Sequence, residues 1–236
     1  MKTKYILFDL DATLLPMDQN EFIKAYFTSL IKYLVPLGFE PQKLYQSIWN
    51  SIMAVVSNDG KCTNEEKFWN EMSGYYGSNI RDSEPFYIDY YVKHFDKNKA
   101  VCGYNESSNI VIKKAKEKGI KIVLATNPVF PRIATEARMR WAGIDDHDFI
   151  YITTYENSHY CKPNLKYYEE ILNVIGATAE ECLMVGNDAF EDMVASTIGM
   201  KVFLLTDCLI NTKNVDISKF SNGSFKELIE YIENLE

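Results

Sequence analysis

The sequence predicts an α/β protein in which a doubly wound parallel sheet contains a helical insertion after its first strand. From about residue 105 onward, short apolar runs typical of buried strands alternate with segments of helical periodicity. Strands that alternate with helices in this way form βαβ units, whose strands are parallel. A further strand pattern, 5–8, lies far upstream and must therefore rejoin this sheet.

Two carboxylates follow this first strand directly. The run Tyr-Ile-Leu-Phe is followed directly by Asp9, and Asp11 and Thr13 lie two and four positions after Asp9. In an open parallel sheet, ligands bind beyond the carboxyl ends of the strands, so these side chains are expected at the edge of a site. Carboxylates this close repel each other unless a proton or a cation intervenes, and Mg²⁺ prefers such oxygen ligands. On these residues alone, an Asx-rich turn is an equally good interpretation.

The segment 17–96 is expected to be helical. Its apolar residues recur at three- and four-residue spacing, and Thr63 with Glu66 matches a capping box. This pattern predicts four helices, at about 21–34, 41–55, 63–74 and 84–95. The segment contains half of the aromatic residues of the chain, which favours a bundle with its own aromatic core over a stacking platform for a sugar or a base.

The remaining elements alternate up to the carboxyl end. The expected helices are at about 106–118, 131–141, 165–175, 191–197 and 224–234, and the expected strands are at 120–125, 149–152, 182–185 and 201–205. The chain is thus predicted to consist of an α/β core, formed by 1–16 and 97–236, and an insertion, 17–96, over the carboxyl edge of the sheet.

Three strands are followed at once by polar side chains that can perform chemistry. These are Asp9 and Asp11 after the first strand, Thr126 and Asn127 after the second, and Asn187 and Asp188 after the strand at 182–185. Three such groups at one edge describe a site. Lys162, just before Pro163 and a helix, is a further candidate, although a lone lysine is more often a solvated surface charge.

Asp188 and Asp192 lie four residues apart, around the first turn of the helix expected at 191–197. This spacing allows both side chains to face the same side. Carboxylates in a first turn can also simply interact with the helix dipole. The metal interpretation is favoured because Asp9 needs a counter-charge and no basic residue follows its strand.

Composition limits the function further. A net charge of −8 and a pI near 5.1 argue against binding to a nucleic-acid polymer or an anionic membrane, since both need a basic face. No apolar run is long enough to span a membrane, and the first apolar run is too short for a signal peptide. Five widely spaced cysteines without a CxxC pair predict a reducing cytoplasm, with no disulfide framework and no zinc site.

With these motifs in order, the chain resembles the haloacid dehalogenase-like (HAD) hydrolase superfamily, in the branch with a helical cap after the first strand. The resemblance covers essentially the whole chain and includes a Rossmann-like core. It is carried by Asp9-Leu10-Asp11-Ala12-Thr13, by Thr126 at a strand end, by Lys162-Pro163, and by Gly186-Asn187-Asp188 with Asp192. Two positions depart from the family pattern. Ala12 replaces a usual glycine and reduces backbone freedom there, and Asn187 stands where aspartate is more common.

The resemblance implies an Mg²⁺-dependent phosphatase that acts on a small phosphorylated metabolite through an aspartyl-phosphate. It implies that Asp9 is the nucleophile and Asp11 the general acid and base. It further implies that phosphate is bound by Thr126, the Asn127 backbone N–H and Lys162. The metal would be bound by Asp9, the Asp11 carbonyl and Asp188, with Asp192 either as a further ligand or as a group that supports the ligands from behind.

Several alternatives stay open from the sequence. A dehalogenase lacks the acid at the position of Asp11, but a phosphomutase of the same family would keep it. A non-catalytic phospho-aspartate module, similar to a response-regulator receiver, shares the acidic metal site, although such modules are about half as long and lack the insertion. Lys24, Lys43 and Lys61 are candidate substrate contacts in the cap, with surface positions the simpler interpretation. The oligomeric state is open.

Overall fold

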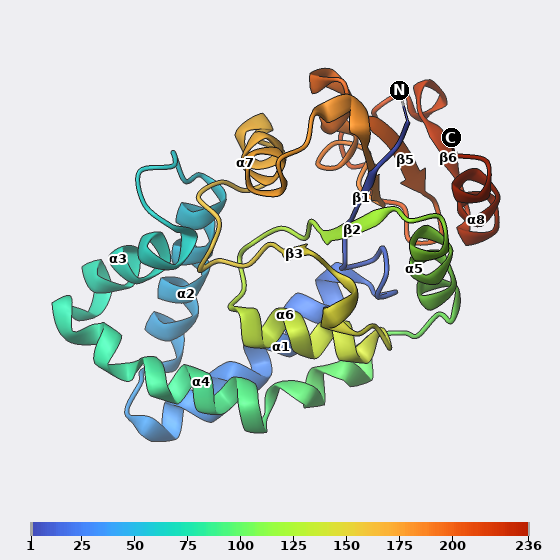
Figure 1. Cartoon of the computed structure of the whole chain (residues 1–236). Coiled ribbons are helices and arrows are strands. Elements are labelled where there is room, and N and C mark those ends of the chain that lie inside the picture. Colours follow the sequence, from blue (N-terminus) through green and yellow to red (C-terminus); the bar gives the residue numbers. More distant parts are fainter. Residues whose placement is uncertain (1, 236) are drawn as a thin grey trace.

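The computed structural model of the chain describes residues 2–235 and contains a six-stranded parallel sheet (Figure 1). The strands are β1 (Tyr5–Phe8), β2 (Lys121–Leu124), β3 (Tyr151–Ile152), β4 (Cys182–Gly186), β5 (Lys201–Leu205) and β6 (Ser221–Gly223). Their order is β3-β2-β1-β4-β5-β6, and each pairing is parallel. The predicted doubly wound α/β fold is confirmed. The outer limits of the predicted core, 1 and 236, lie outside the described residues.

β1 lies at the centre of the sheet, where the strand order reverses. Phe8, its last residue, is paired with Leu124 of β2 on one side and with Val185 of β4 on the other. The carboxyl ends of these three strands therefore meet at one point of the edge. In doubly wound sheets such a reversal is where ligands bind.

Helices cover both faces of the sheet. Ile6 and Phe8 pack in one hydrophobic cluster with α5 (Ser107–Glu117), α6 (Arg132–Trp141) and α8 (Phe225–Glu233). Tyr5 and Leu7 point to the opposite face and pack in a second cluster with α7 (Leu165–Ile175). Figure 1 shows α5 beside α8 and α7 on the other side of the strands. Burial on both faces explains why β1 is an unbroken apolar run without alternation.

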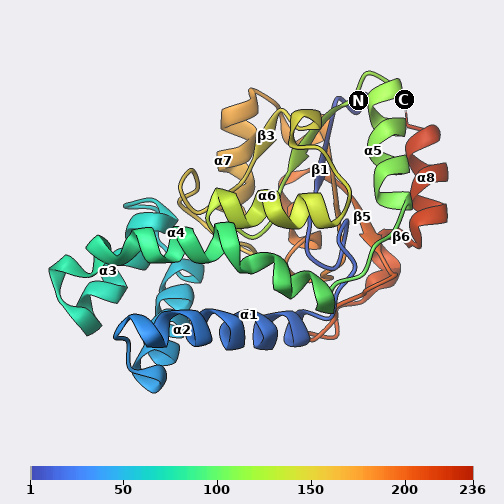
Figure 2. The same cartoon turned by 90° about the horizontal axis from the view of Figure 1, so that it is seen from below.

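The segment between β1 and α5 is helical, as predicted. It contains α1 (Gln19–Leu34), η1 (Val35–Leu37), α2 (Pro41–Val56), α3 (Asn64–Tyr76), η2 (Ser78–Ser83), α4 (Glu84–Lys93) and η3 (Phe95–Val101), where η denotes a 3₁₀-helix. The expected capping box of α3 is present, because Thr63 and Glu66 each bond the other's backbone N–H. In Figure 2 α1 to α4 lie together, away from β5, β6 and α8.

The aromatic residues of this segment are packed as a core, in which Tyr26, Tyr90 and Phe95 are buried. This core is continuous with the sheet. The Phe95 ring stacks on Trp141 of α6 with 5.0 Å between centroids, and the cluster that contains Ile6 extends to Tyr90. The helical insertion is therefore anchored to α6 by aromatic packing. Its assignment as a separate cap domain stays a prediction.

Two elements differ from the predictions. The helix expected at 191–197 is a short 3₁₀-helix, η6 (Met193–Ile198), because the side chains of Asp188 and Asp192 hydrogen-bond to nearby backbone N–H groups and compete with α-helical bonds. The strand β6 was not predicted, since its sequence Ser-Asn-Gly is typical of a turn. Three further 3₁₀-helices are η4 (Asp146–Asp148), η5 (Ala179–Glu181) and η7 (Ile217–Lys219).

Within residues 2–235, none of the helices has the length and hydropathy needed to cross a membrane. The five cysteines are free thiols.

Candidate active site

A cavity of about 230 Å³ lies at the carboxyl ends of β1, β2 and β4. Each residue that the sequence singled out for the site lines this cavity, namely Asp9, Asp11, Thr126, Asn127, Lys162, Asp188 and Asp192. Asn187 and Glu191 lie beside them in the same wall. The structure thus brings together side chains that are up to 183 positions apart in the chain.

Lys162 is buried between two carboxylates. Its Nζ lies 2.9 Å from Oδ1 of Asp9 and 2.6 Å from Oδ1 of Asp192, and only 2% of the residue is exposed. Burial alone would lower the pKa of the ammonium, but Asp192 and Asp9 together hold this pKa well above its usual range. The surface position that is usual for a lone lysine is therefore wrong for Lys162, which supplies the counter-charge of Asp9.

Both oxygens of the Asp9 carboxylate are held. Oδ1 accepts from Lys162, and Oδ2 accepts from the hydroxyl of Thr13 at 2.9 Å. The same hydroxyl lies 3.0 Å from Oδ1 of Asn187. Asp9 itself continues the sheet, because its N–H donates to the carbonyl of Val185 at 2.9 Å. The carboxylate thus has a fixed orientation at the floor of the cavity.

Ala12 has a left-handed backbone. Its φ is 60°, a conformation that costs a non-glycine residue about 1–2 kcal/mol. The turn is closed by hydrogen bonds between Ala12 and Leu15 and between Leu15 and Leu10, each 2.8 Å long. The reduced freedom expected at this position is therefore present as a strained turn, directly after Asp11.

Asp11 is bound to a buried arginine that the sequence analysis missed. Nη1 of Arg138 donates to Oδ2 of Asp11, while Nε donates to the Ala134 carbonyl at 3.3 Å and Nη2 to the Thr135 hydroxyl at 3.3 Å. The guanidinium also lies 4.4 Å from the centre of the Phe130 ring. The sequence contains a sign of this role, because Arg138 lies four residues after Ala134 and so on the apolar face of its helix, where a charged residue needs a partner.

The other oxygen of Asp11, Oδ1, is buried and has no hydrogen-bond partner among residues 2–235. Burial raises the pKa of the Asp11 carboxyl, and Arg138 offsets part of this effect. One oxygen of Asp11 is therefore fixed by the arginine, and the other is left without a partner.

Asp188 and Asp192 form one compact turn. Oδ2 of Asp192 accepts from the Asp188 N–H at 2.9 Å, and Oδ1 of Asp188 accepts from the N–H groups of Phe190 and Glu191 at 2.7 and 2.9 Å. A Cβ atom at Gly186 would lie 2.1 Å from Oδ2 of Asp192, so this position requires glycine. Both oxygens of Asp192 are thus engaged by Lys162 and Asp188.

Asn127 connects the lysine segment to the acidic turn. Its Oδ1 accepts from the Lys162 N–H at 3.2 Å, and its Nδ2 donates to Oε2 of Glu191 at 3.2 Å. Glu191 was not among the predicted site residues. Its burial raises its carboxyl pKa to about 7. Thr126 is buried, and its carbonyl accepts from the hydroxyls of Thr153 and Tyr167.

The donor set fits a hard divalent cation. Among the residues that line the cavity or contact them, five carboxylates face two cationic side chains: Asp9, Asp11, Asp188, Glu191 and Asp192 against Lys162 and Arg138. The unpartnered Oδ1 of Asp11 is a further sign of unbalanced negative charge. A cation that prefers oxygen ligands would relieve this repulsion.

The predicted ligands are not gathered into a closed cage. Within residues 2–235, three acidic or histidine ligand atoms lie within 4.8 Å of one another at Asp145, Asp146 and His147, in a turn that does not line the cavity. At the candidate site, Lys162 occupies the space between Asp9 and Asp192. The space between these two carboxylates is thus filled by the ammonium group, which leaves Asp9, the Asp11 carbonyl and Asp188 as the groups that could hold a cation.

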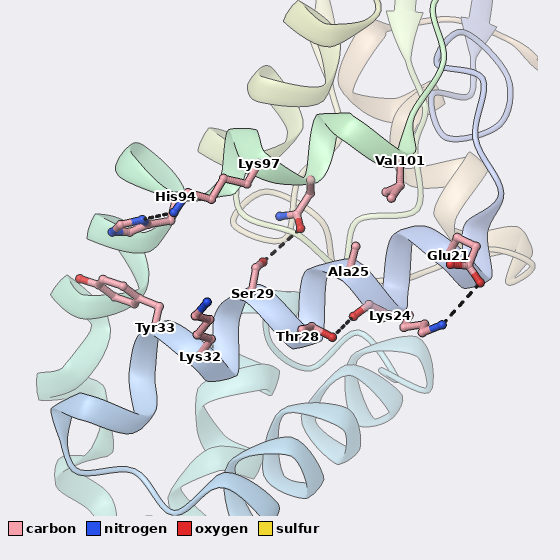
Figure 3. A pocket seen from close by; sticks show the side chains of 11 residues that line it. Glu21, Lys24, Ala25, Thr28, Ser29, Lys32, Tyr33, His94, Lys97 and Val101 are labelled. Atoms are coloured by element: carbon pink, nitrogen blue, oxygen red, sulfur yellow. Dashed lines mark hydrogen bonds and ion pairs between the residues drawn. The ribbon is translucent and has the colours of Figure 1, made fainter.

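A second cavity, of about 590 Å³, lies between α1 and η3 (Figure 3). Its lining includes Lys24, Lys32, Lys97 and His94, with Glu21 directed toward Lys24. Glu21 is the one carboxylate among these lining residues, so this cavity lacks the pair of carboxylates that the proposed phosphoryl chemistry needs. α1 separates the two cavities, since Gln19, Phe22 and Ile23 line the smaller one.

The three insertion lysines considered from the sequence do not line the smaller cavity. Lys24 pairs with Glu21, Lys61 pairs with Asp59, and Lys43 lies over the ring of Tyr76. The simpler interpretation, surface positions, therefore holds for these lysines.

Comparisons with known proteins identify the family and the fold of the chain. The family model for haloacid dehalogenase-like hydrolases matches residues 6–205. Among solved structures, a HAD phosphatase from Thermococcus onnurineus is 16% identical with a TM-score of 0.59, over 98% of both chains. YfnB of Bacillus subtilis, solved bound to magnesium, is 16% identical with a TM-score of 0.55, over 100% of both chains. The L-2-haloacid dehalogenase from Xanthobacter autotrophicus is 12% identical with a TM-score of 0.54, over 99% of this chain and 100% of that one.

These structural similarities are at low identity and show the fold alone. A search of curated proteins by sequence found no match. The family model, in contrast, covers the greater part of the chain, from β1 to β5. The chain therefore belongs to the haloacid dehalogenase-like hydrolase family.

Proposed function

We propose that the protein is an Mg²⁺-dependent phosphatase that hydrolyses a small phosphorylated metabolite through an aspartyl-phosphate on Asp9. The observation that supports this most directly is the buried contact of Lys162 with Asp9, at 2.9 Å. A buried lysine beside a nucleophilic carboxylate can neutralise the charge that an incoming phosphate adds. Catalysis of phosphoryl transfer depends mainly on such positioning and charge neutralisation.

In the first step an oxygen of Asp9 forms a bond to phosphorus while the bond from phosphorus to the ester oxygen breaks. Asp11 donates a proton to the leaving oxygen, and its unpartnered Oδ1 is available for this contact. In the second step water attacks phosphorus, Asp11 accepts a proton from that water, and Asp9 leaves. The net reaction converts a monoester and water into an alcohol and phosphate.

Three groups would hold the phosphate oxygens: the Thr126 hydroxyl, the Asn127 backbone N–H and the Lys162 ammonium. No hydrogen bond within residues 2–235 engages the Thr126 hydroxyl, although the residue is buried in the cavity wall. The cation would be bound by Asp9, the Asp11 carbonyl and Asp188, and it would neutralise phosphate charge. Asp192, whose two oxygens are already engaged, would position Lys162 and Asp188 from behind.

Two alternatives predict different outcomes. A phosphomutase would transfer the phosphoryl group to a second hydroxyl of a sugar instead of to water. A phospho-aspartate regulatory module would be labelled once and would not turn over. The helical insertion contributes Phe22 and Ile52 to the cavity, which supports an enzyme with an enclosed substrate over a signalling module.

The test uses p-nitrophenyl phosphate with Mg²⁺. We expect turnover that is lost in EDTA and restored by added Mg²⁺. Asp9→Asn should abolish it, whereas Asp82→Asn, which changes an exposed carboxylate in η2, should leave it unchanged. Acid quenching should trap a phosphoryl group on Asp9. Stable stoichiometric labelling without turnover would instead support the regulatory module, and unchanged rates in EDTA would remove the metal from the scheme.

A further inference from the structure

We propose that this site selects phosphate esters whose alcohol portion is apolar, an alkyl or aryl group, over esters of polyols and sugars. The proposal rests on the phosphatase function above and names the substrate class of the same site. It derives from the lining of the 230 Å³ cavity, which combines ionic residues at the strand ends with an apolar wall supplied mostly by the helical insertion.

The apolar wall comes from three segments of the chain. It is formed by Met17, Phe22 and Ile23 at the start of the insertion and in α1, Ile52 and Val56 in α2, and Val129 and Phe130 in the loop after β2. Gln19 contributes the amide group in this wall. The phosphate end of a substrate would lie on Asp9 and Lys162, so its alcohol portion would face these apolar side chains.

This wall offers little to a substrate rich in hydroxyl groups. A hydroxyl that leaves water and finds no partner lowers binding about tenfold or more. Each methylene group removed from water, in contrast, increases binding about fourfold. Both effects therefore favour an ester with an apolar alcohol portion over an ester of a polyol.

A second anionic group on the substrate is also disfavoured. Within residues 2–235, Lys162 is the cationic residue that lines the cavity, and it is already bound to Asp9 and Asp192. The remaining charged residues around the phosphate end are carboxylates, including Asp188 and Glu191. A carboxylate on the alcohol portion would meet repulsion there and no partner on the apolar wall.

The volume sets an upper limit on size. At about 230 Å³, the cavity is smaller than the roughly 300–1,000 Å³ typical of sites for drug-sized ligands. It therefore accommodates a phosphate with a short chain or a single ring.

The experiment measures kcat/KM with Mg²⁺ for methyl, ethyl, propyl and butyl phosphate and for benzyl phosphate. We expect an increase of about fourfold per methylene group. The decisive pair is propyl phosphate against glycerol 1-phosphate, which share three carbons and differ by two hydroxyl groups. Propyl phosphate should be preferred by about tenfold or more, although glycerol is the better leaving group.

Variants assign the selection to the wall. Ile52→Asn should reduce the ratio of butyl to methyl phosphate by about fivefold, because an amide replaces an apolar contact. Met53→Asn is the matched control. Met53 is the next residue of α2, is 47% exposed and does not line the cavity, so the substitution lowers helix propensity without changing the wall. The ratio should be unchanged in this control.

The outcomes separate the two proposals. If all the esters are hydrolysed but kcat/KM does not rise with chain length, or glycerol 1-phosphate is preferred over propyl phosphate, the apolar selection is refuted and the phosphatase proposal stands. A failure to hydrolyse any of these esters or p-nitrophenyl phosphate would refute the phosphatase and this proposal with it. A rising series that Ile52→Asn flattens and Met53→Asn preserves supports both.

Discussion

Arg138→Met should destabilise the protein by about 3 kcal/mol. The substitution removes a guanidinium that is fully buried and leaves the Asp11 carboxylate without its partner. Breaking a buried ion pair by removing one member costs about 3–5 kcal/mol. The lower end applies here, because 21% of the Asp11 side chain is exposed and water can reach part of it. Methionine can keep part of the contact with the Phe130 ring.

A double-mutant cycle isolates the pair from the packing. Asp11→Asn should also be destabilising, because it leaves the buried Arg138 without an anion. The double variant contains neither charge, so we expect it to be about 2 kcal/mol more stable than the sum of the single effects predicts. Free energies of unfolding would be measured by urea titration in EDTA, which keeps bound cations out of the comparison.

Arg140→Met is the control for this cycle. Arg140 lies two residues further along α6 and is exposed, so its replacement should change the free energy of unfolding by less than about 0.5 kcal/mol. Additive single effects, or a cost below about 1 kcal/mol for Arg138→Met, would show that the ion pair does not contribute as argued.

Three further predictions concern single positions. Ala12→Gly should change the free energy of unfolding by less than about 0.5 kcal/mol in urea titrations, because the relief of left-handed strain is offset by the added chain entropy and by the loss of a buried methyl group. A change above about 1 kcal/mol in either direction would contradict this. Lys162→Met should lower the free energy of unfolding by at least about 3 kcal/mol, since Asp9 and Asp192 lose their shared cation. Added Mg²⁺ should raise the melting temperature of this variant more than that of the parent, and an equal rise would argue against a cation site beside Asp9. Cys161 should resist iodoacetamide in the folded protein, because it is 1% exposed and burial raises its thiol pKa, whereas the partly exposed Cys208 should react. The labelled positions would be identified by peptide mass mapping, and labelling of Cys161 as early as Cys208 would refute its burial.

The acidic residues of the site could be predicted because their placement is a local property. Asp9 and Asp188 each follow the end of an apolar strand, and parallel strands bring such ends to one edge. The partners of these residues could not be predicted in the same way. That Lys162 lies between Asp9 and Asp192 depends on how a loop folds back over the sheet, which no periodicity encodes.

Arg138 and the apolar wall show two other limits. A charged residue on an apolar helical face is visible in the sequence, but its partner is known only when α6 is placed against the loop after β1. The wall of the cavity depends on which side of α2 faces the sheet. The apolar periodicity of α2 contains Ile52 and not its exposed neighbour Met53, but periodicity alone does not state that Ile52 borders the cavity.

The contact of Lys162 with Asp9 and Asp192 has a consequence for synthesis of the protein. The three residues come from the first strand, the loop before α7 and the turn before η6. During synthesis Asp9 is made before both of its partners, because Lys162 follows 153 positions later and Asp192 a further 30 positions later. This ionic contact therefore cannot form until all three segments have been synthesised, and a product truncated before Asp192 would lack one of the two carboxylates that hold Lys162.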